Sequence, residues 1–231
     1  MPTTKSKSFD AGSSPLGSNF RILIPAALIA LYSLLFGPLL LRSATTPAGY
    51  SVIGFAVFWA VALGLVALSR SGGDRSPVSI GFRSLSWKWV AAALAIGVLL
   101  SLLVPVLTLL VTRVLPSSDV GGILDTAGQY PSWVVLLSVL TAGVTEEIIF
   151  RGDLIERLLE ATGNPWGSAL LSLGAFILPH LAGWNPAHIL GVVIPLGAVL
   201  TGLYMWKRNV LFVMIVHVMI DAPLFLLSFG A

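Results

Sequence analysis

The sequence predicts an all-α protein, a polytopic bundle of about seven or eight transmembrane helices. The 231 residues are 56% hydrophobic and only 10% charged, whereas a soluble domain carries about 25% charged residues. The mean hydropathy is +0.95. Seven apolar segments are each long enough for a membrane span, which takes about 20 residues, and they cover residues 20–41, 50–69, 87–115, 132–151, 166–184, 188–206 and 209–230.

The N-terminal segment, residues 1–19, is polar and rich in small residues. We expect a disordered tail ahead of a single transmembrane domain over residues 20–231. If this tail is cytoplasmic, eleven of the 13 Lys and Arg residues fall on the cytoplasmic side, and only Arg42 and Arg113 fall outside. Because cytoplasmic loops are enriched in Lys and Arg, the sequence predicts a cytoplasmic N-terminus in a plasma membrane of bacterial type. Seven spans put the C-terminus outside, and an eighth would reverse it.

The net charge and the cysteine content exclude some partners and some chemistries. The formal net charge of +3 comes without a basic patch apart from the membrane flanks, so the expected partner is the lipid bilayer and not a nucleic acid. The chain has no cysteine, which excludes disulfides and a cysteine protease.

The later helices have recognisable boundaries, whereas the first two spans are generic. The third span is long enough to tilt, or to begin as an interfacial helix at "SLSWKW". The helix that starts near residue 132 keeps its periodicity to Ala161. It is predicted to end with Gly163 and Asn164 as C-cap residues, and Pro165 begins the next helix.

Tryptophans near the segment ends are typical of an aromatic belt that binds no ligand; they are Trp87, Trp89, Trp133, Trp166, Trp184 and Trp206.

Ionisable side chains at membrane depth are rare and usually functional. Here they gather in the last four spans and include all 3 histidines of the chain. The set is Glu146, Glu147, Arg151, His180, His188, His217 and Asp221.

Helix geometry assigns different roles to the two adjacent glutamates. In an α-helix of 3.6 residues per turn, consecutive side chains point about 100° apart, so the two cannot both face one site. Arg151 follows Glu147 by four residues, the favourable order for an ion pair, and this pair is interpreted as structural. Glu146 has no local partner and shares its face with small residues. It is therefore the functional candidate.

Counting from the predicted turns places four side chains at a similar depth in the inner half of the bilayer. Glu146 precedes Gly163 by 17 residues and His180 follows it by 17, so an antiparallel hairpin brings them level, although Pro179 is expected to kink the second helix. His217 and Asp221 are four residues apart and share a helix face.

Two further aromatic side chains are expected to serve packing. Phe176 lies four residues before His180 and is expected to form a wall of the site. His188 lies in the predicted outer turn "GWNPAHIL" and is interpreted as a packing residue.

This constellation permits hydrolysis without a covalent intermediate. A carboxylate beside an imidazole can hold and deprotonate water, and a second imidazole can stabilise an oxyanion. The same groups could instead bind Zn²⁺, the one cofactor considered, with Glu146, His180, His217 and Asp221 as candidate ligands. The H-E-x-x-H motif of zincins and a G-x-S-x-G nucleophile elbow are absent from the sequence, as is a facing pair of aspartates. These absences argue against zincin, rhomboid-like and presenilin-like proteases.

Three motifs in order, "EEIIFR", "FILPH" and "HVMID", resemble those of the CAAX-protease and bacteriocin-processing (CPBP, or Abi) intramembrane proteases. That family shows E-E-x-x-x-R, F-x-x-x-H and H-x-x-x-N or D. The basic stretch "SIGFRSLSWKW" also resembles the family, so the resemblance covers about Ser79 to Pro223.

The resemblance implies an intramembrane endopeptidase that cuts near the cytoplasmic face. The family is named as one of metalloproteases. It implies that Glu146 activates water with His180, and that His217 and Asp221 hold the oxyanion. Glu147 and Arg151 match the remaining motif positions. Many members have Asn at position 221, and an ionised Asp cannot donate a hydrogen bond. Asp221 must therefore be protonated, orient His217 or ligate a metal.

The expected substrate is a peptide or protein, membrane-anchored or prenylated. A non-catalytic immunity or scaffold protein of the same fold is the alternative. A proton-coupled transporter that uses Glu146 and Asp221 is a third option, against which the missing broken-helix repeats argue.

Overall fold

The computed structural model describes residues 47–71, 77–115, 130–181 and 184–229, and every regular element within them is helical. This confirms the all-α prediction for these residues. Two elements, η2 and η3, are π-helices and η1 is a 3₁₀-helix. In chain order the elements are α2 (Pro47–Ser71), η1 (Pro77–Ile80), α3 (Trp87–Val114), α5 (Ser132–Thr141), η2 (Ala142–Leu154), α6 (Ile155–Thr162), α7 (Pro165–His180), α8 (Pro186–His188), η3 (Ile189–Val193), α9 (Ile194–Lys207) and α10 (Val210–Leu227).

Five helices of the described residues are long and apolar enough to cross a membrane. They are Ser51–Ser69, Trp87–Val114, Ser132–Thr162, Pro186–Lys207 and Val210–Leu227. The predicted span 166–184 corresponds to α7, which has 16 residues and is shorter than the usual span of about 20. The predicted tail, residues 1–19, and the predicted first span, 20–41, lie outside the described residues. The membrane-spanning character is therefore supported, and the number of seven or eight spans stays a prediction.

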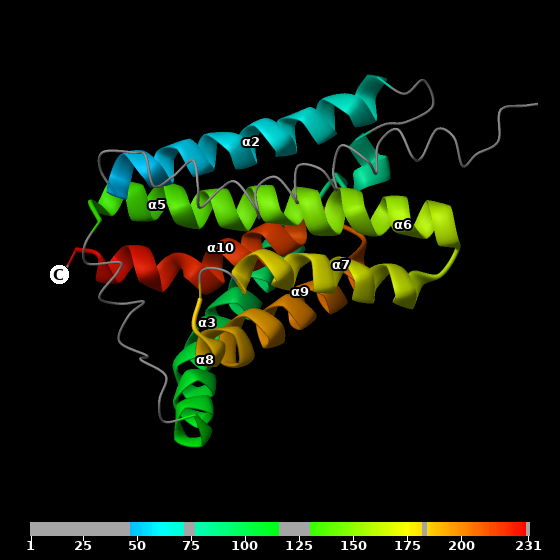
Figure 1. Ribbon diagram of the computed structural model, residues 1–231. Coiled ribbons are helices and arrows are strands. Elements are labelled where there is room, and N and C mark those ends of the chain that lie inside the picture. The colour runs from blue at the N-terminus through cyan, green and yellow to red at the C-terminus, as the bar shows by residue number, and fades with distance from the viewer. Residues whose placement is uncertain (1–46, 72–76, 116–129, 182–183, 230–231) are drawn as a thin grey trace, which may run out of the picture.

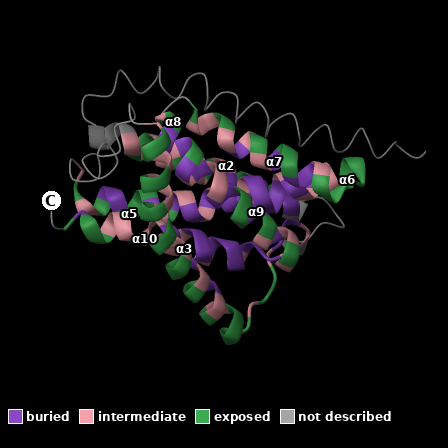
Figure 2. Cartoon of the chain, turned by 90° about the horizontal axis from the view of Figure 1, so that it is seen from below, coloured by how far each residue is buried: buried purple, intermediate pink, exposed green. Residues whose placement is uncertain are grey.

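A single long helix formed by α5, η2 and α6 organises the bundle (Figure 1). α2 packs along one side of it and α10 along another, and α7 returns beside α6 and η2. α10 also contacts α3 and α9, so it is the central helix of the bundle. Buried residues gather where these helices meet, whereas exposed residues cover their outer faces (Figure 2). Most large exposed side chains on α3 are Leu or Val, as expected for a surface that faces lipid.

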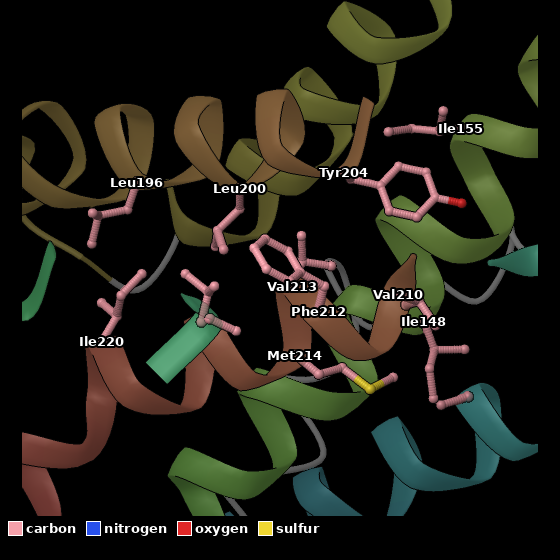
Figure 3. Packing of buried hydrophobic residues seen from close by; sticks show 13 residues of the cluster. Ile148, Ile155, Leu196, Leu200, Tyr204, Val210, Phe212, Val213, Met214 and Ile220 are labelled. Carbon is pink, nitrogen blue, oxygen red and sulfur yellow. The ribbon is translucent and has the colours of Figure 1, made fainter. Parts of the chain in front are cut away.

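The main hydrophobic core holds η2 and α6 against α9 and α10 (Figure 3). Small residues allow the closest approaches to α10. A Cβ added at Gly143 of η2 would lie 3.0 Å from the backbone nitrogen of Val218, and one at Gly97 of α3 would lie 2.9 Å from the carbonyl oxygen of Val216. Such close backbone contacts are typical of helices packed in membranes. They fix how η2 and α3 are each rotated relative to α10.

The predicted turn between α6 and α7 is present, with one correction. Gly163 ends α6 in the left-handed conformation, with φ of 64°. Asn164 is the N-cap residue of α7 and not a C-cap residue of α6, because its side chain accepts a hydrogen bond from the backbone N–H of Gly167 at 3.0 Å. Pro165 is the first residue of α7 as predicted. Pro179 produces no kink inside a longer helix, because α7 ends one residue later at His180.

The π-helix η2 was not predicted, since the sequence analysis assumed α-helical geometry. A π-helix uses i→i+5 hydrogen bonds and is frequent at functional sites. Two side-chain hydroxyls supply additional hydrogen bonds to carbonyl groups in this region. Thr145 donates to the Thr141 carbonyl at 2.6 Å, and Ser172 of α7 donates to the Phe150 carbonyl, also at 2.6 Å. Satisfied carbonyls matter here because the membrane interior offers no water as a partner.

Candidate active site

A cavity of about 290 Å³ lies between α3, α5, η2, α7, α8, η3, α9 and α10. Five of the seven ionisable residues singled out in the sequence line it: Glu146, His180, His188, His217 and Asp221. The other two, Glu147 and Arg151, are fully buried. The fold therefore brings the four predicted catalytic side chains to one cavity, together with a third histidine.

Glu146 projects from η2 into this cavity. No hydrogen bond joins its carboxyl group to another described side chain, whereas it is close enough to His217 and Asp221 to interact with them electrostatically. Its oxygens therefore remain available to hold a water molecule or a substrate group.

His180 ends α7, and its orientation follows from a single contact. Nδ1 lies 2.8 Å from the carbonyl oxygen of Phe176. Because a carbonyl only accepts hydrogen bonds, Nδ1 carries the proton and Nε2 holds a lone pair. The ring also packs on the Phe176 ring, with 4.8 Å between centroids. Phe176 is thus a buried wall of the cavity, as predicted, and it also fixes the tautomer of the histidine.

His217 of α10 is anchored by Glu147, a contact that the sequence analysis missed. Glu147 Oε1 accepts from Arg151 Nη1 at 2.7 Å, which is the predicted ion pair, and also from His217 Nδ1 at 2.8 Å. The glutamate and the histidine are 70 residues apart. Spacing along one helix could reveal the first contact, but no pattern in the sequence reveals the second.

Arg151 makes two further contacts inside the core, although its Nε and Glu147 Oε2 are buried without a hydrogen-bond partner among the described residues. Arg151 Nη2 donates to the carbonyl oxygen of Gly197 at 3.2 Å, and its guanidinium lies 4.3 Å from the centroid of the Phe176 ring. Arg151 is fully buried, and the helix continues beyond it to Thr162.

The last predicted pair, His217 and Asp221, shares one face of α10. His217 Nε2 lies 3.5 Å from Asp221 Oδ2. Both ring nitrogens of His217 therefore face carboxylate oxygens, Nδ1 that of Glu147 and Nε2 that of Asp221.

His188 and Trp184 both line the cavity, which the sequence analysis did not predict. The sequence analysis assigned His188 to a packing role in an outer turn and Trp184 to an aromatic belt that binds no ligand. All six belt tryptophans are exposed, but Trp184 also lines the cavity. Its ring stacks on that of His188, with 4.3 Å between centroids and 28° between planes. The seventh tryptophan, Trp59, instead donates to Thr141 Oγ1 at 3.0 Å.

The described residues hold no complete metal site as they are placed. No group of three or more His, Cys, Asp or Glu side chains among them is positioned to hold a metal ion. The contacts of His180 with Phe176 and of His217 with Glu147 engage Nδ1 alone; a metal-binding histidine commonly has its other nitrogen engaged in this way, so these contacts do not argue against zinc. No step below is assigned to a metal.

Comparison with known proteins agrees with the motifs. No curated protein and no solved structure matches the chain significantly. Residues 128–223 match the sequence model of the family described as Type II CAAX prenyl endopeptidase Rce1-like. This region contains all three motifs and the residues Glu146, His180, His217 and Asp221. The match confirms the resemblance to the CAAX proteases over residues 128–223.

Proposed function

We propose that this protein is an intramembrane endopeptidase of the CAAX-protease type that uses water activated by Glu146. The observation that supports it best is the gathering of Glu146, His180, His217 and Asp221 around one cavity in the apolar bundle. Ionisable groups at membrane depth destabilise the bundle, and where they occur they are usually functional. A scaffold would not need all four groups in one place.

The proposed reaction begins with a water molecule held between the Glu146 carboxylate and His180 Nε2. Glu146 takes a proton from this water, whose oxygen attacks the carbonyl carbon of the peptide bond. The carbonyl π electrons move to oxygen and form an oxyanion. When this tetrahedral intermediate collapses, the C–N bond breaks and the leaving amine receives the proton from Glu146.

His217 is proposed to stabilise the oxyanion from Nε2. Its Nδ1–H is committed to Glu147, because a glutamate paired with Arg151 can only accept. Donation from Nε2 therefore requires the imidazolium form of His217. Asp221, 3.5 Å from this nitrogen, is assigned the role of orienting the ring, since an ionised Asp cannot itself donate to the oxyanion.

The substrate is proposed to be a membrane-anchored peptide, including a prenylated C-terminus. Away from the ionisable residues the cavity wall is largely apolar, and it includes Val104, Pro105, Val192, Leu224 and Leu227. Such a wall suits a lipid chain or apolar side chains. The expected orientation, with Lys207 and Arg208 on the cytoplasmic side, leads to the proposal that cleavage occurs from that side.

The direct test uses the purified protein in liposomes with a fluorescence-quenched peptide that carries a farnesylated cysteine followed by three residues. Cleavage products are identified by mass spectrometry, and a Glu146→Gln variant serves as the control. Cleavage by the wild type alone supports the proposal. The scaffold alternative is correct under three conditions. The wild type does not cleave the peptide, the membrane proteins of cells with and without this protein have the same C-termini, and a Glu146→Ala strain behaves like the wild-type strain.

A further inference from the structure

His188 is held in place without the use of its ring nitrogens. Asn185 caps α8, and its side-chain oxygen accepts from the backbone N–H of His188 at 2.8 Å. The imidazole stacks on Trp184 and lines the cavity. These contacts fix the backbone and one face of the imidazole ring, and neither of them uses the ring nitrogens.

The two ring nitrogens of His188 have different surroundings. Nδ1 is buried and has no hydrogen-bond partner among the described residues. A buried N–H without a partner is rarer in proteins than a buried acceptor without one, so the proton belongs on Nε2. Since Nδ1 is inaccessible and the ring lines the cavity, the cavity side of the ring presents the Nε2–H group.

His188 differs in this respect from the other two histidines of the cavity. Nδ1 of His180 donates to Phe176, and Nδ1 of His217 donates to Glu147. Each of those rings is tied to the protein and matches a family motif. The polar edge of His188 has no such tie within the described residues and lies outside the three motifs.

A peptide inside this cavity needs hydrogen-bond donors. Each buried backbone carbonyl that loses water without gaining a partner destabilises the complex, and the apolar wall offers few partners. An N–H group fixed in direction by a stacked ring loses little conformational entropy when it binds such an oxygen.

We propose that His188 is a substrate-binding residue whose Nε2–H donates to a carbonyl or carboxylate oxygen of the bound peptide. Trp184 holds the ring in the required direction. This inference rests on the proposed peptidase function for the identity of the ligand and adds a residue that sets affinity, not the chemical step.

The chain offers a matched pair of variants. His188→Phe keeps an aromatic ring that can stack on Trp184 but removes the N–H, whereas His188→Gln keeps a donor and loses the stack. Steady-state kinetics are measured with the farnesylated peptide as a free acid and as a C-terminal amide. We expect His188→Phe to raise KM about fivefold to tenfold, the effect of one hydrogen bond, with kcat unchanged. His188→Gln should recover part of the loss.

The two peptides identify the oxygen that His188 binds. A loss of affinity confined to the free acid assigns the terminal carboxylate, and an equal loss for both peptides assigns a backbone carbonyl. An unchanged KM, or a fall in kcat alone, overturns the proposal. If neither variant folds, His188 is a packing residue and the proposal is also wrong.

Direct binding separates this proposal from the peptidase function. Dissociation constants of the same peptides are measured for Glu146→Gln and for Glu146→Gln with His188→Phe, by fluorescence anisotropy. Weaker binding by the double variant supports the role of His188 even if the wild type cleaves nothing, in which case only the peptidase function fails. Cleavage by the wild type with equal binding by both variants contradicts the role of His188 alone.

Discussion

Glu146 and Glu147 are neighbours in the chain with opposite surroundings. Glu146 lines the cavity, whereas Glu147 is fully buried and bonded to Arg151 and His217. Glu146 can contact a substrate or a water molecule in the cavity, whereas Glu147 can act only through Arg151 and His217. Substitution should therefore separate a chemical role from a positioning role.

Replacing Glu146 with Gln should lower activity by about a hundredfold or more, because the general base is lost while the shape is kept. Folded yield and thermal stability should stay close to wild type, since no hydrogen bond to a described residue is removed. The measurements are peptide cleavage and thermal unfolding of the same preparation. A variant that keeps wild-type activity would show that another group activates the water.

Replacing Glu147 with Gln should lower both yield and activity. Breaking one side of a buried ion pair costs about 3–5 kcal/mol. The amide oxygen of Gln can still accept a hydrogen bond from His217 or Arg151, but Arg151 and the proposed imidazolium of His217 both lose their carboxylate partner. Adding Arg151→Met should restore much of the folded yield but little of the activity. Yield is followed by size-exclusion chromatography and activity by peptide cleavage.

The outcome of this double variant distinguishes two interpretations. From the sequence alone, Glu147 serves only the ion pair, so the folded double variant would be active. The contact of the Glu147 carboxylate with His217 predicts instead that the double variant has little activity, because the proposed imidazolium loses its negatively charged partner. Recovery of both yield and activity would mean that Glu147 is structural only.

At the scale of the helices, the π-helix η2 depends on its neighbour α7. The Phe150 carbonyl accepts from the hydroxyl of Ser172, which lies 22 residues further along the chain. This contact ties the helix that carries Glu146 to the helix that carries His180. It also holds the two proposed water-binding groups in register.

Ser172→Ala should destabilise the protein by about 1–3 kcal/mol, because a buried polar group loses a partner. The matched control is Ser69→Ala in α2, which removes an equally buried hydroxyl whose bond is local, to the Val66 carbonyl. Thermal unfolding in one detergent compares the two. Equal and small changes in both would show that the contact between η2 and α7 contributes nothing.

Much of this arrangement follows from patterns in the sequence, and the reasons for the misses are physical. Hydropathy predicts helices, and the spacing of Glu147 and Arg151 predicts their contact, because both act within one segment. The contact of Glu147 with His217 depends on how two helices rotate about their axes. That rotation is set by close packing at residues such as Gly143, which apolar patterns do not encode. The same limit concealed the approach of His188 to the cavity.

At the scale of the whole molecule, side-chain contacts join several helices at the end of the bundle that carries Lys207 and Arg208. Glu156 of α6 accepts from Tyr204 and Arg208, and the side chain of Asn209 donates to the carbonyl of Arg83 at 3.1 Å. Lys207 Nζ lies 3.0 Å from the centroid of the Trp89 ring. These contacts join α6, α9, α10 and the segment before α3 at the end away from Leu227.

Chelation should weaken activity only partially or slowly, because the described residues gather no group of three metal-binding side chains. The purified protein is incubated with 1,10-phenanthroline, assayed for cleavage and analysed for metal content. Stoichiometric zinc, with full loss of activity on chelation and recovery when metal is added back, would contradict this prediction.

The position of Glu147 has a consequence for how this protein can evolve. Buried ion pairs are often replaced by apolar residues without loss of stability, so selection for stability alone would tend to discard Glu147 and Arg151. Since the same carboxylate also bonds to His217, a lineage that took this route would keep the bundle and lose the anchor of its proposed oxyanion donor. Two substitutions would then abolish the proposed activity and leave a membrane protein of the same shape. If the proposed peptidase function is correct, the pair should persist only in descendants that keep that activity.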